Sequence, residues 1–363
     1  NGTHTHVLDA STLPNGMEVK DAGYWAWRLV ETKSGPSARQ YHAMASLGDG
    51  RVLMYGGRND NKYFNDAWIF ALSSPSSNIG DDKNGAAAAA VGKWTPTKDG
   101  PSARYDHAMA TLGDGRVLMY GGYGGNSLKD AWIFELSPFL NIDNEKNGAV
   151  TAAAAAAAAA VKTWTRTKDG PSARNDHTMA TLGNGRVLMF GGRDDNKNLN
   201  DAWVFELALS LNIVGNWVPA TIGPSARFHH AMASVENGRV LMYGGWDGIS
   251  HLNDAWIFEL SSTFLNIGNR NNGVTAEAAG AAAAAAVGKW TKSKDGPSLR
   301  GTHSMASSGN GRVLMYGGWD GINHLNDAWM FELSSTFLNI ANENNGVAAE
   351  ALVGNWARTM DGP

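Results

Sequence analysis

Apolar and polar residues follow one order that returns five times along the chain. In the second copy, a short apolar-rich run, His107–Leu112, precedes Asp-Gly, a wholly apolar run, Arg116–Tyr120, and two glycines. An alternating segment, Asp130–Leu136, comes next, and a lone Trp164 lies before the following copy. Runs of this length and periodicity predict four short strands per copy, which we call strands a, b, c and d in chain order.

The residues between these runs predict how the strands are joined. Asp114-Gly115, between strands a and b, is a strong hairpin signal because both residues tolerate positive φ. Strand b, Arg116–Tyr120, is apolar on both faces, as expected for a strand buried between neighbouring sheets. Gly121-Gly122 ends that strand where the backbone bends without a side chain. Each copy therefore predicts one four-stranded antiparallel sheet.

The spacing of the copies predicts how the sheets are arranged. The element Pro-Ser-Ala/Leu-Arg begins at Pro36, Pro101, Pro171, Pro224 and Pro297, at intervals of 53 to 73 residues. A repeat of roughly 50 residues with four short strands is typical of a β-propeller, in which neighbouring blades bury each other's faces. The sequence predicts an all-β propeller in one domain, with full blades at 35–99, 100–169, 170–222, 223–295 and 296–363.

The diglycine after strand b, the Trp of strand c and the Trp before the next Pro-x-x-Arg-x-x-His resemble the kelch-repeat family over residues 35–363. The resemblance implies a kelch propeller of six or seven blades, with strand a lining the axis and strand d outermost. Residues 1–34 resemble strands c and d, at His6–Thr12 and Trp25–Val30. We therefore expect a partial N-terminal blade, and six blades in a closed ring if sequence after Pro363 supplies the missing strands a and b.

Long insertions separate strands c and d in four of the five copies and share Asn-Ile, Asn-Gly and an alanine run. The longest alanine run is Ala152–Ala160. Because alanine is the best helix former and carries little recognition chemistry, we predict short helices or loops expanded by repeat slippage. The alternative is a set of ridges that dock a neighbour in a larger assembly.

Composition narrows the class of protein. The 363 residues are 43% hydrophobic and 18% charged, which is typical of a folded, soluble chain. A net charge of −4 with interspersed signs offers no basic patch, so we do not expect nucleic acid as a partner. No apolar stretch is long enough to insert into a membrane. The compartment stays open, with a single N-glycosylation sequon at Asn1.

The sequence shows no catalytic signature and predicts neither catalytic residues nor a cofactor nor a metal. The absence of cysteine excludes disulfides, thiolate nucleophiles and the Cys-Tyr crosslink that radical-copper oxidases of this shape require. The Glu-x-x-x-Asp-x-x-x-His run of iron-binding, nitrile-specifying kelch proteins is missing, as are a nucleophile elbow, His-Glu-x-x-His and a phosphate loop. Weak calcium binding at Asp194-Asp195 is an open alternative.

Some polar residues recur in every copy. They are Arg39, Arg104, Arg174, Arg227 and Arg300; His42, His107, His177, His230 and His303; and Asp66, Asp130, Asp201, Asp254 and Asp327. A residue needed in every blade is expected to be architectural, the arginines and histidines tying one blade to the next and the aspartates bonding in turns. The alternative for the arginines and histidines is a ring of anion- or metal-binding groups near the axis.

Function is expected where the copies differ, on the face where the b–c loops and d–a turns emerge. The d–a side of this face displays Tyr41, Tyr105, Asp106, Asn175, Asp176, Phe228, His229 and Thr302. The predicted ligand- or partner-binding residues are Arg58, Tyr105, Tyr123, Arg193, Phe228, His229, Trp246 and Trp319. Aromatic and arginine side chains dominate binding hot spots, so we predict a non-catalytic protein-protein interaction or scaffold module. The alternative is a carbohydrate-binding or sugar-modifying propeller, in which Tyr123, Trp246 and Trp319 stack on a sugar.

Overall fold

The computed structural model describes residues 35–72, 92–97, 100–136, 162–207, 215–261, 287–333 and 354–359. Within these ranges the chain forms twenty β-strands and no helix. The strands form five separate four-stranded antiparallel sheets, each in chain order. The predicted partial blade at 1–34 and the alanine-rich insertions lie outside the described residues.

The five sheets are the five full blades. Blade 1 contains β1 (Ala43–Ser46), β2 (Val52–Tyr55), β3 (Ala67–Leu72) and β4 (Gly92–Pro96). Blade 2 contains β5 (Ala108–Gly113), β6 (Arg116–Tyr120), β7 (Ala131–Leu136) and β8 (Lys162–Arg166). Blade 3 contains β9 (Thr178–Gly183), β10 (Arg186–Phe190), β11 (Ala202–Leu207) and β12 (Gly215–Pro219). Blade 4 contains β13 (Ala231–Glu236), β14 (Arg239–Tyr243), β15 (Ala255–Leu260) and β16 (Gly288–Lys292). Blade 5 contains β17 (Ser304–Gly309), β18 (Arg312–Tyr316), β19 (Ala328–Leu333) and β20 (Gly354–Arg358).

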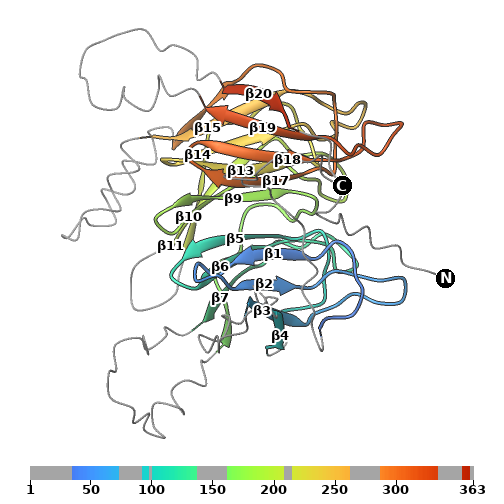
Figure 1. Cartoon of the computed structure of the whole chain (residues 1–363). Coiled ribbons are helices and arrows are strands. Elements are labelled where there is room, and N and C mark those ends of the chain that lie inside the picture. Colours follow the sequence, from blue (N-terminus) through green and yellow to red (C-terminus); the bar gives the residue numbers. More distant parts are fainter. Residues whose placement is uncertain are drawn as a thin grey trace, which may run out of the picture.

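The blades are arranged around a common centre, with strand a of each blade innermost. Neighbouring first strands approach one another in the order β1, β5, β9, β13, β17. In Figure 1 these strands lie toward the middle, whereas the fourth strands β4 and β20 lie at the lower and upper ends. The predicted all-β propeller of four-stranded antiparallel blades is confirmed, with five blades in the described part of the chain.

The main core lies between blades. We call the face that a blade turns to the next blade in chain order its forward face, and the opposite one its backward face. Leu53 and Tyr55 on the forward face of blade 1 are fully buried against Val117 and Met119 on the backward face of blade 2. Leu118 of the same β6 strand faces blade 3 instead. Strand b is therefore apolar on both faces because each face belongs to a different interface.

The glycines after strand b lie where the next blade approaches. The Gly122 N–H donates to the Arg174 carbonyl at 2.9 Å, which joins blades 2 and 3. A Cβ on Gly121, at φ +63°, would lie 2.6 Å from that same carbonyl oxygen. The diglycine is thus required by close backbone approach between blades as well as by the bend.

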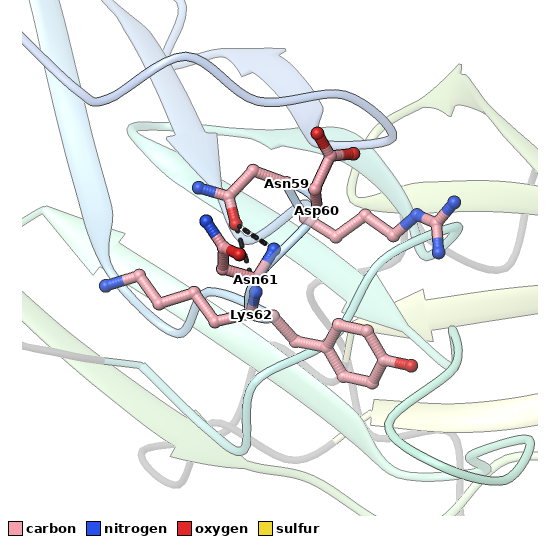
Figure 2. A pocket seen from close by; sticks show the side chains of 6 residues that line it. Asn59, Asp60, Asn61 and Lys62 are labelled. Atoms are coloured by element: carbon pink, nitrogen blue, oxygen red, sulfur yellow. Dashed lines mark hydrogen bonds between the residues drawn. The ribbon is translucent and has the colours of Figure 1, made fainter.

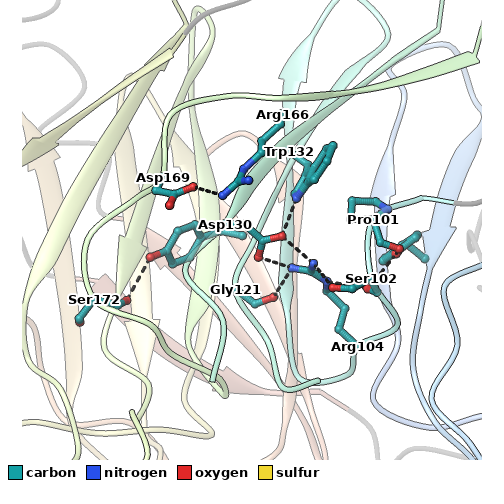
Figure 3. A network of polar contacts seen from close by, with 11 residues as sticks. Pro101, Ser102, Arg104, Gly121, Asp130, Trp132, Arg166, Asp169 and Ser172 are labelled. Carbon is teal, nitrogen blue, oxygen red and sulfur yellow. Dashed lines mark hydrogen bonds and ion pairs between the residues drawn. The ribbon is translucent and has the colours of Figure 1, made fainter. Parts of the chain in front are cut away.

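The recurring arginine and aspartate form one network in each blade, and Figure 3 shows the network of blade 2. The Arg104 guanidinium donates to both carboxylate oxygens of Asp130 at 2.7 Å and to the Gly121 carbonyl at 2.9 Å. The Trp132 indole N–H donates to the same carboxylate at 2.6 Å. The equivalent pairs are Arg39–Asp66, Arg174–Asp201, Arg227–Asp254 and Arg300–Asp327. These residues are architectural, and the sequence expectation needs one correction: the side-chain bonds stay within a blade, and the backbone of Arg104 joins blades through Phe64 and Gly57.

The recurring histidines of blades 2 to 5 are packing residues. The His107 ring lies edge-on to Tyr55 of the preceding blade, with ring centroids 5.5 Å apart. Burial, with the nearby Arg104 charge as a smaller cause, lowers the pKa of His107 to about 3. Each of these histidines is therefore a neutral wedge between two blades at physiological pH.

Candidate functional site

The b–c loops and d–a turns meet on one face of the molecule. Tyr105 of a d–a turn pairs with Tyr123 of a b–c loop through two backbone hydrogen bonds, at 3.1 and 2.8 Å. The other blades make the same bridge, at Gln40–Arg58, Asn175–Arg193, Phe228–Trp246 and Gly301–Trp319. We call Arg58, Tyr123, Arg193, Trp246 and Trp319 the outer ring. The framework thus holds each b–c loop residue at a fixed place while its identity changes from blade to blade.

A second set of variable residues lies beside the first strands. We call this set, Tyr41, Asp106, Asp176, His229 and Thr302, the inner ring. The N–H of Asp106 donates to the Tyr41 carbonyl at 3.2 Å, and the N–H of Asp176 donates to the Asp106 carbonyl at 3.1 Å. The inner ring therefore runs from blade to blade.

All inner-ring residues have φ between 52° and 57°, a left-handed conformation that costs a non-glycine residue about 1 kcal/mol or more. Of the eight predicted binding residues only His229 belongs to this ring, and the sequence placed the other four on the d–a side of the same face. All five inner-ring residues directly precede a recurring histidine in the sequence. The residue type at this position differs between copies, except that blades 2 and 3 both have aspartate.

Blades 1 and 2 contribute an aromatic cluster around one cation. The Arg58 guanidinium lies 5.5 Å from the Tyr41 ring centroid and 5.0 Å from that of Tyr105. Tyr105 also contacts Tyr63 and Tyr123, with ring centroids 4.9 and 5.4 Å apart. Aromatic faces attract cations, so the tyrosines orient the arginine without neutralising it.

An open hollow of about 520 Å³ is lined by the b–c loop of blade 1, residues 58–63. Figure 2 shows how Asn59 shapes this loop: its side-chain oxygen accepts hydrogen bonds from the N–H groups of Asn61 and Lys62, both at 3.0 Å. The side chains of Asp60 and Lys62 are thereby left exposed beside Arg58. The hollow offers charged groups of both signs next to aromatic rings.

Blades 2 to 4 contribute a charged cluster. The Asp176 carboxylate, 4% exposed, accepts from Arg193 Nε at 2.7 Å and lies 3.3 Å from His229 Nε2. Burial would raise the pKa of Asp176, but His229 and Arg193 outweigh it and hold that pKa below its usual value. Asp106 has no such ion pair, and burial together with the neighbouring Asp176 charge raises its pKa to about 7. The two inner-ring carboxylates therefore differ in charge near neutral pH.

This difference gives a prediction for Asp106→Asn. A folded-state pKa raised above the unfolded value means that the stability contributed by the protonated carboxyl is lost as pH rises through about 7. We expect the variant to exceed the wild type in free energy of unfolding by about 2 kcal/mol at pH 8 and by roughly half of that at pH 5.5, because the unfolded carboxyl is ionised at both pH values and the folded one only at pH 8. Urea unfolding at both pH values measures the difference. Asp60→Asn, on an exposed side chain, is the control, and a pH-independent difference for Asp106→Asn would contradict the prediction.

Blades 4 and 5 present two nearly identical loops. The Trp246 and Trp319 rings pack on His251 and His324, with ring centroids 4.6 Å apart in both loops. In the blade 4 loop, the Asp247 carboxylate accepts from two backbone N–H groups, which fixes the turn and leaves Ile249 88% exposed. Each loop therefore presents an exposed isoleucine, Ile249 or Ile322, next to a packed tryptophan–histidine pair.

The predicted site residues form two groups and one separate member. Arg58, Tyr105 and Tyr123 come together on blades 1 and 2, and Arg193, Phe228, His229 and Trp246 on blades 3 and 4. Trp319 lies apart on blade 5, beside Gly301 and His324. The structure thus distributes the predicted residues over most of the face.

The two aspartates of the calcium alternative are engaged in separate structural contacts. Asp194 accepts from the backbone of its own loop, and Asp195 accepts from Ser127 of blade 2 at 2.7 Å. In the described ranges no three His, Asp or Glu side chains converge as a metal-binding group would. Nor do those ranges contain a helix with the length and apolar character that a membrane crossing needs.

Five four-stranded blades, a diglycine after every strand b and one Arg–Asp–Trp network per blade define a kelch-repeat propeller. A family model for the KLHDC2/KLHL20/DRC7 kelch-repeats domain matches residues 4–138 and 86–289, so the chain belongs to this kelch-repeat family.

Several curated proteins are similar to this chain. F-box/kelch-repeat protein At1g51550 of Arabidopsis thaliana is 23% identical over 321 residues, which is 84% of this chain and 57% of that protein. Kelch repeat-containing protein 2 of Saccharomyces cerevisiae is 24% identical over 274 residues, covering 70% of this chain and 27% of that protein. The flagellar outer arm dynein alpha chain of Chlamydomonas reinhardtii is 23% identical over 278 residues, 71% of this chain and 5% of that protein. The chain thus spans less than two thirds of the length of each of these relatives.

Proposed function

We propose that this chain is a non-catalytic interaction module, and that it binds a protein partner through the face formed by the inner and outer rings. The observation that carries the proposal is the contrast between framework and rings. The Arg–Asp–Trp network recurs in every described blade, with Arg–Asp distances of 2.5 to 2.7 Å. The outer ring, by contrast, changes from arginine to tyrosine to tryptophan. A constant scaffold that displays variable side chains is the arrangement expected of a recognition surface.

The backbone of the inner ring supports the same proposal. Holding a non-glycine residue in a left-handed conformation at all five inner-ring positions costs stability in every blade. Folding alone would favour glycine there, as it does at the hairpin and diglycine positions. A strained conformation kept with tyrosine, aspartate, histidine and threonine side chains is consistent with a role for those side chains in binding.

The face is chemically uneven, which favours one partner in one orientation. Blades 1 and 2 offer Arg58 among tyrosines, and blade 3 offers Arg193 already paired with Asp176. Blades 4 and 5 offer tryptophan with exposed isoleucine tips. A protein surface with apolar and polar patches fits this pattern, because hot spots pair with complementary hot spots across an interface.

Affinity capture with matched variants tests the proposal. The face variant combines Arg58→Ala, Tyr105→Ala, Trp246→Ala and Trp319→Ala, all on the b–c loops and d–a turns. The control variant combines Lys289→Ala and Lys292→Ala on the outer strand β16, where both side chains are more than half exposed. We expect the wild type and the control to capture the same purified partner, with at least a tenfold weaker dissociation constant for the face variant, equivalent to about 1.4 kcal/mol.

Two results would count against the proposal. The first is equal affinity of the face variant and the wild type for every partner recovered. The second is binding to a glycan array that needs Trp246 and Trp319 while no protein partner depends on the face, which would favour the carbohydrate alternative. Circular dichroism of the face variant must match that of the wild type, since none of its four positions lies in the buried core.

A further inference from the structure

The exposed aliphatic side chains of the loop face lie on two neighbouring blades. In the described part of the chain they are Ile222 and Leu299, in the d–a turns that enter blades 4 and 5, and Ile249 and Ile322, in the b–c loops of those blades. Ile249 and Ile322 are 88% and 80% exposed, and Ile222 is 77% exposed. Side chains this exposed add little buried area to the fold, so they are available to a partner.

Other blades have polar or smaller residues at the same positions. Asn61 and Asn196 occupy the position of the two loop isoleucines in blades 1 and 3. The turns that enter blades 1 to 4 have alanine at the position of Leu299. Duplication of a repeat explains one isoleucine at the same place in two similar loops, but it does not explain Ile222 and Leu299, which lie at other repeat positions. The aliphatic side chains of blades 4 and 5 therefore gather on one part of the face for a reason other than repetition.

The b–c loops of blades 4 and 5 are fixed in shape and lie next to each other. A Cβ on Gly321 would lie 3.2 Å from His251 Nδ1, so the backbone of the blade 5 loop lies against the histidine of the blade 4 loop. The Asp320 carboxylate accepts from two backbone N–H groups of its own loop at 2.7 and 2.6 Å, in the same way as Asp247. Both loops thus present their isoleucines on ordered turns, which reduces the entropic cost of binding.

The same two loops carry negative charge. Hydrogen bonds from the backbone N–H groups of Ser250 and Asn323 lower the pKa of Asp247 and Asp320 respectively, so both carboxylates are ionised at neutral pH. Residues 246–251 and 319–324 include no lysine or arginine, whereas the corresponding loops of blades 1 and 3 each contain one of both. Anionic groups beside aliphatic ones complement a surface that is itself aliphatic and basic.

We propose that blades 4 and 5 bind a partner segment that carries aliphatic side chains next to lysine or arginine. Ile249 and Ile322 contact its aliphatic groups, and Asp247 and Asp320 contact its basic groups. The inference rests on the proposed function, because the segment belongs to the protein partner, and it adds the chemistry of that segment. An anionic membrane surface fits less well, because it repels the two carboxylates.

The repeats themselves supply mild substitutions for a test. The isoleucine variant combines Ile249→Asn with Ile322→Asn, which introduces the residue that blades 1 and 3 have at this position. The charge variant combines Asp247→Asn with Asp320→Asn, which keeps a side-chain oxygen in each loop. Asn59 of blade 1 makes the same two hydrogen bonds with its amide oxygen, so the loops should keep their shape. Circular dichroism of both variants should match that of the wild type.

Binding of the full chain to an array of short synthetic peptides measures the preference. The four peptide classes have random sequences rich in leucine and lysine, leucine and glutamate, serine and lysine, or serine and glutamate. We expect the leucine–lysine class to bind most tightly, about tenfold or more weakly to the isoleucine variant and several-fold more weakly to the charge variant, with less dependence on salt. Asp60→Asn, which removes an exposed carboxylate from the blade 1 loop, is the control and should bind as the wild type does.

Several results would overturn this inference. Preference for leucine–glutamate peptides, or equal affinity of the isoleucine variant and the wild type, would do so. Absence of peptide binding, while capture of a protein partner depends on Arg58 and Tyr105, would overturn it and leave the proposed function intact. If the proposed function itself is wrong, neither these variants nor Arg58→Ala alters the capture of any protein. Isoleucine-dependent binding to phosphatidylserine vesicles, or isoleucine-dependent dimers in analytical ultracentrifugation, without peptide binding, would replace the partner segment with a membrane or a second copy.

Discussion

Replacing Arg104 by methionine is expected to lower the free energy of unfolding by about 3–5 kcal/mol. The Arg104 side chain is fully buried and the Asp130 side chain is only 19% exposed. The substitution therefore leaves a largely buried carboxylate without its cation. It also removes the donor to the Gly121 carbonyl. Burial would raise the pKa of Asp130, but the bonds from Arg104 outweigh it and hold that pKa below its usual value. Urea unfolding at pH 7 measures the loss.

Arg166→Met is the matched control for this prediction. Arg166 belongs to the same blade and pairs with Asp169 at 2.7 Å, the distance found between Arg104 and Asp130. Its side chain is 56% exposed, however, and an ion pair in water contributes little to stability (Figure 3). Similar losses for the two variants would show that the buried network is not what stabilises the blade.

Acidification is expected to destabilise the fold well above the pH range in which carboxylates titrate. Burial lowers the pKa of His107, His177 and His303 to about 3, and that of His230 well below its usual 6.5. As pH falls below 6.5 the unfolded chain binds protons that the folded chain excludes, so stability falls with pH. Each histidine contributes about 1.4 kcal/mol per pH unit, and Asp106 opposes with one proton, which leaves about 4 kcal/mol per unit between pH 6 and pH 4.

Urea unfolding at pH 7.5, 6.5, 5.5 and 4.5 checks this slope. His177→Gln should reduce it by about one third, because the net number of excluded protons falls from three to two. His324→Gln, at an exposed position, should leave it unchanged. A free energy of unfolding that stays constant from pH 7.5 to pH 5.5 would show that the buried histidines take up protons in the folded state after all.

Both predictions concern the framework, and the framework is what the proposed function needs. The Arg–Asp–Trp networks and histidine wedges fix the d–a turns and b–c loops, on which the inner and outer rings lie. A partner then meets a surface that is already ordered, which reduces the entropic cost of binding. Loss of a framework residue should therefore weaken partner binding through stability, whereas loss of a ring residue should weaken it directly.

Local features of the sequence determined the blade. The order of apolar runs predicted four strands, and the turn between strands a and b followed from Asp114-Gly115, which adopts φ of 52° and 73°. Strand b was predicted to be buried on both faces from its unbroken apolar run, and Leu118 and Met119 indeed face different neighbours. These features follow from period and backbone preference, which are readable in a few adjacent residues.

Three things were decided only by the tertiary structure. The partners of Arg104 lie in its own blade, which no spacing could show because Asp130 is brought beside it by two intervening strands. The left-handed backbone of the inner ring is invisible in residue types such as Tyr41 or Thr302, which rarely adopt it. The exposed forward face of blade 5 depends on what lies next to it, since Tyr316 and Tyr243 occupy matching positions in their repeats. The strands and turns of each repeat depend on adjacent residues, so the sequence determines them. The partners of a side chain, its backbone strain and its burial depend on segments that are distant in the sequence, so only the tertiary structure decides them.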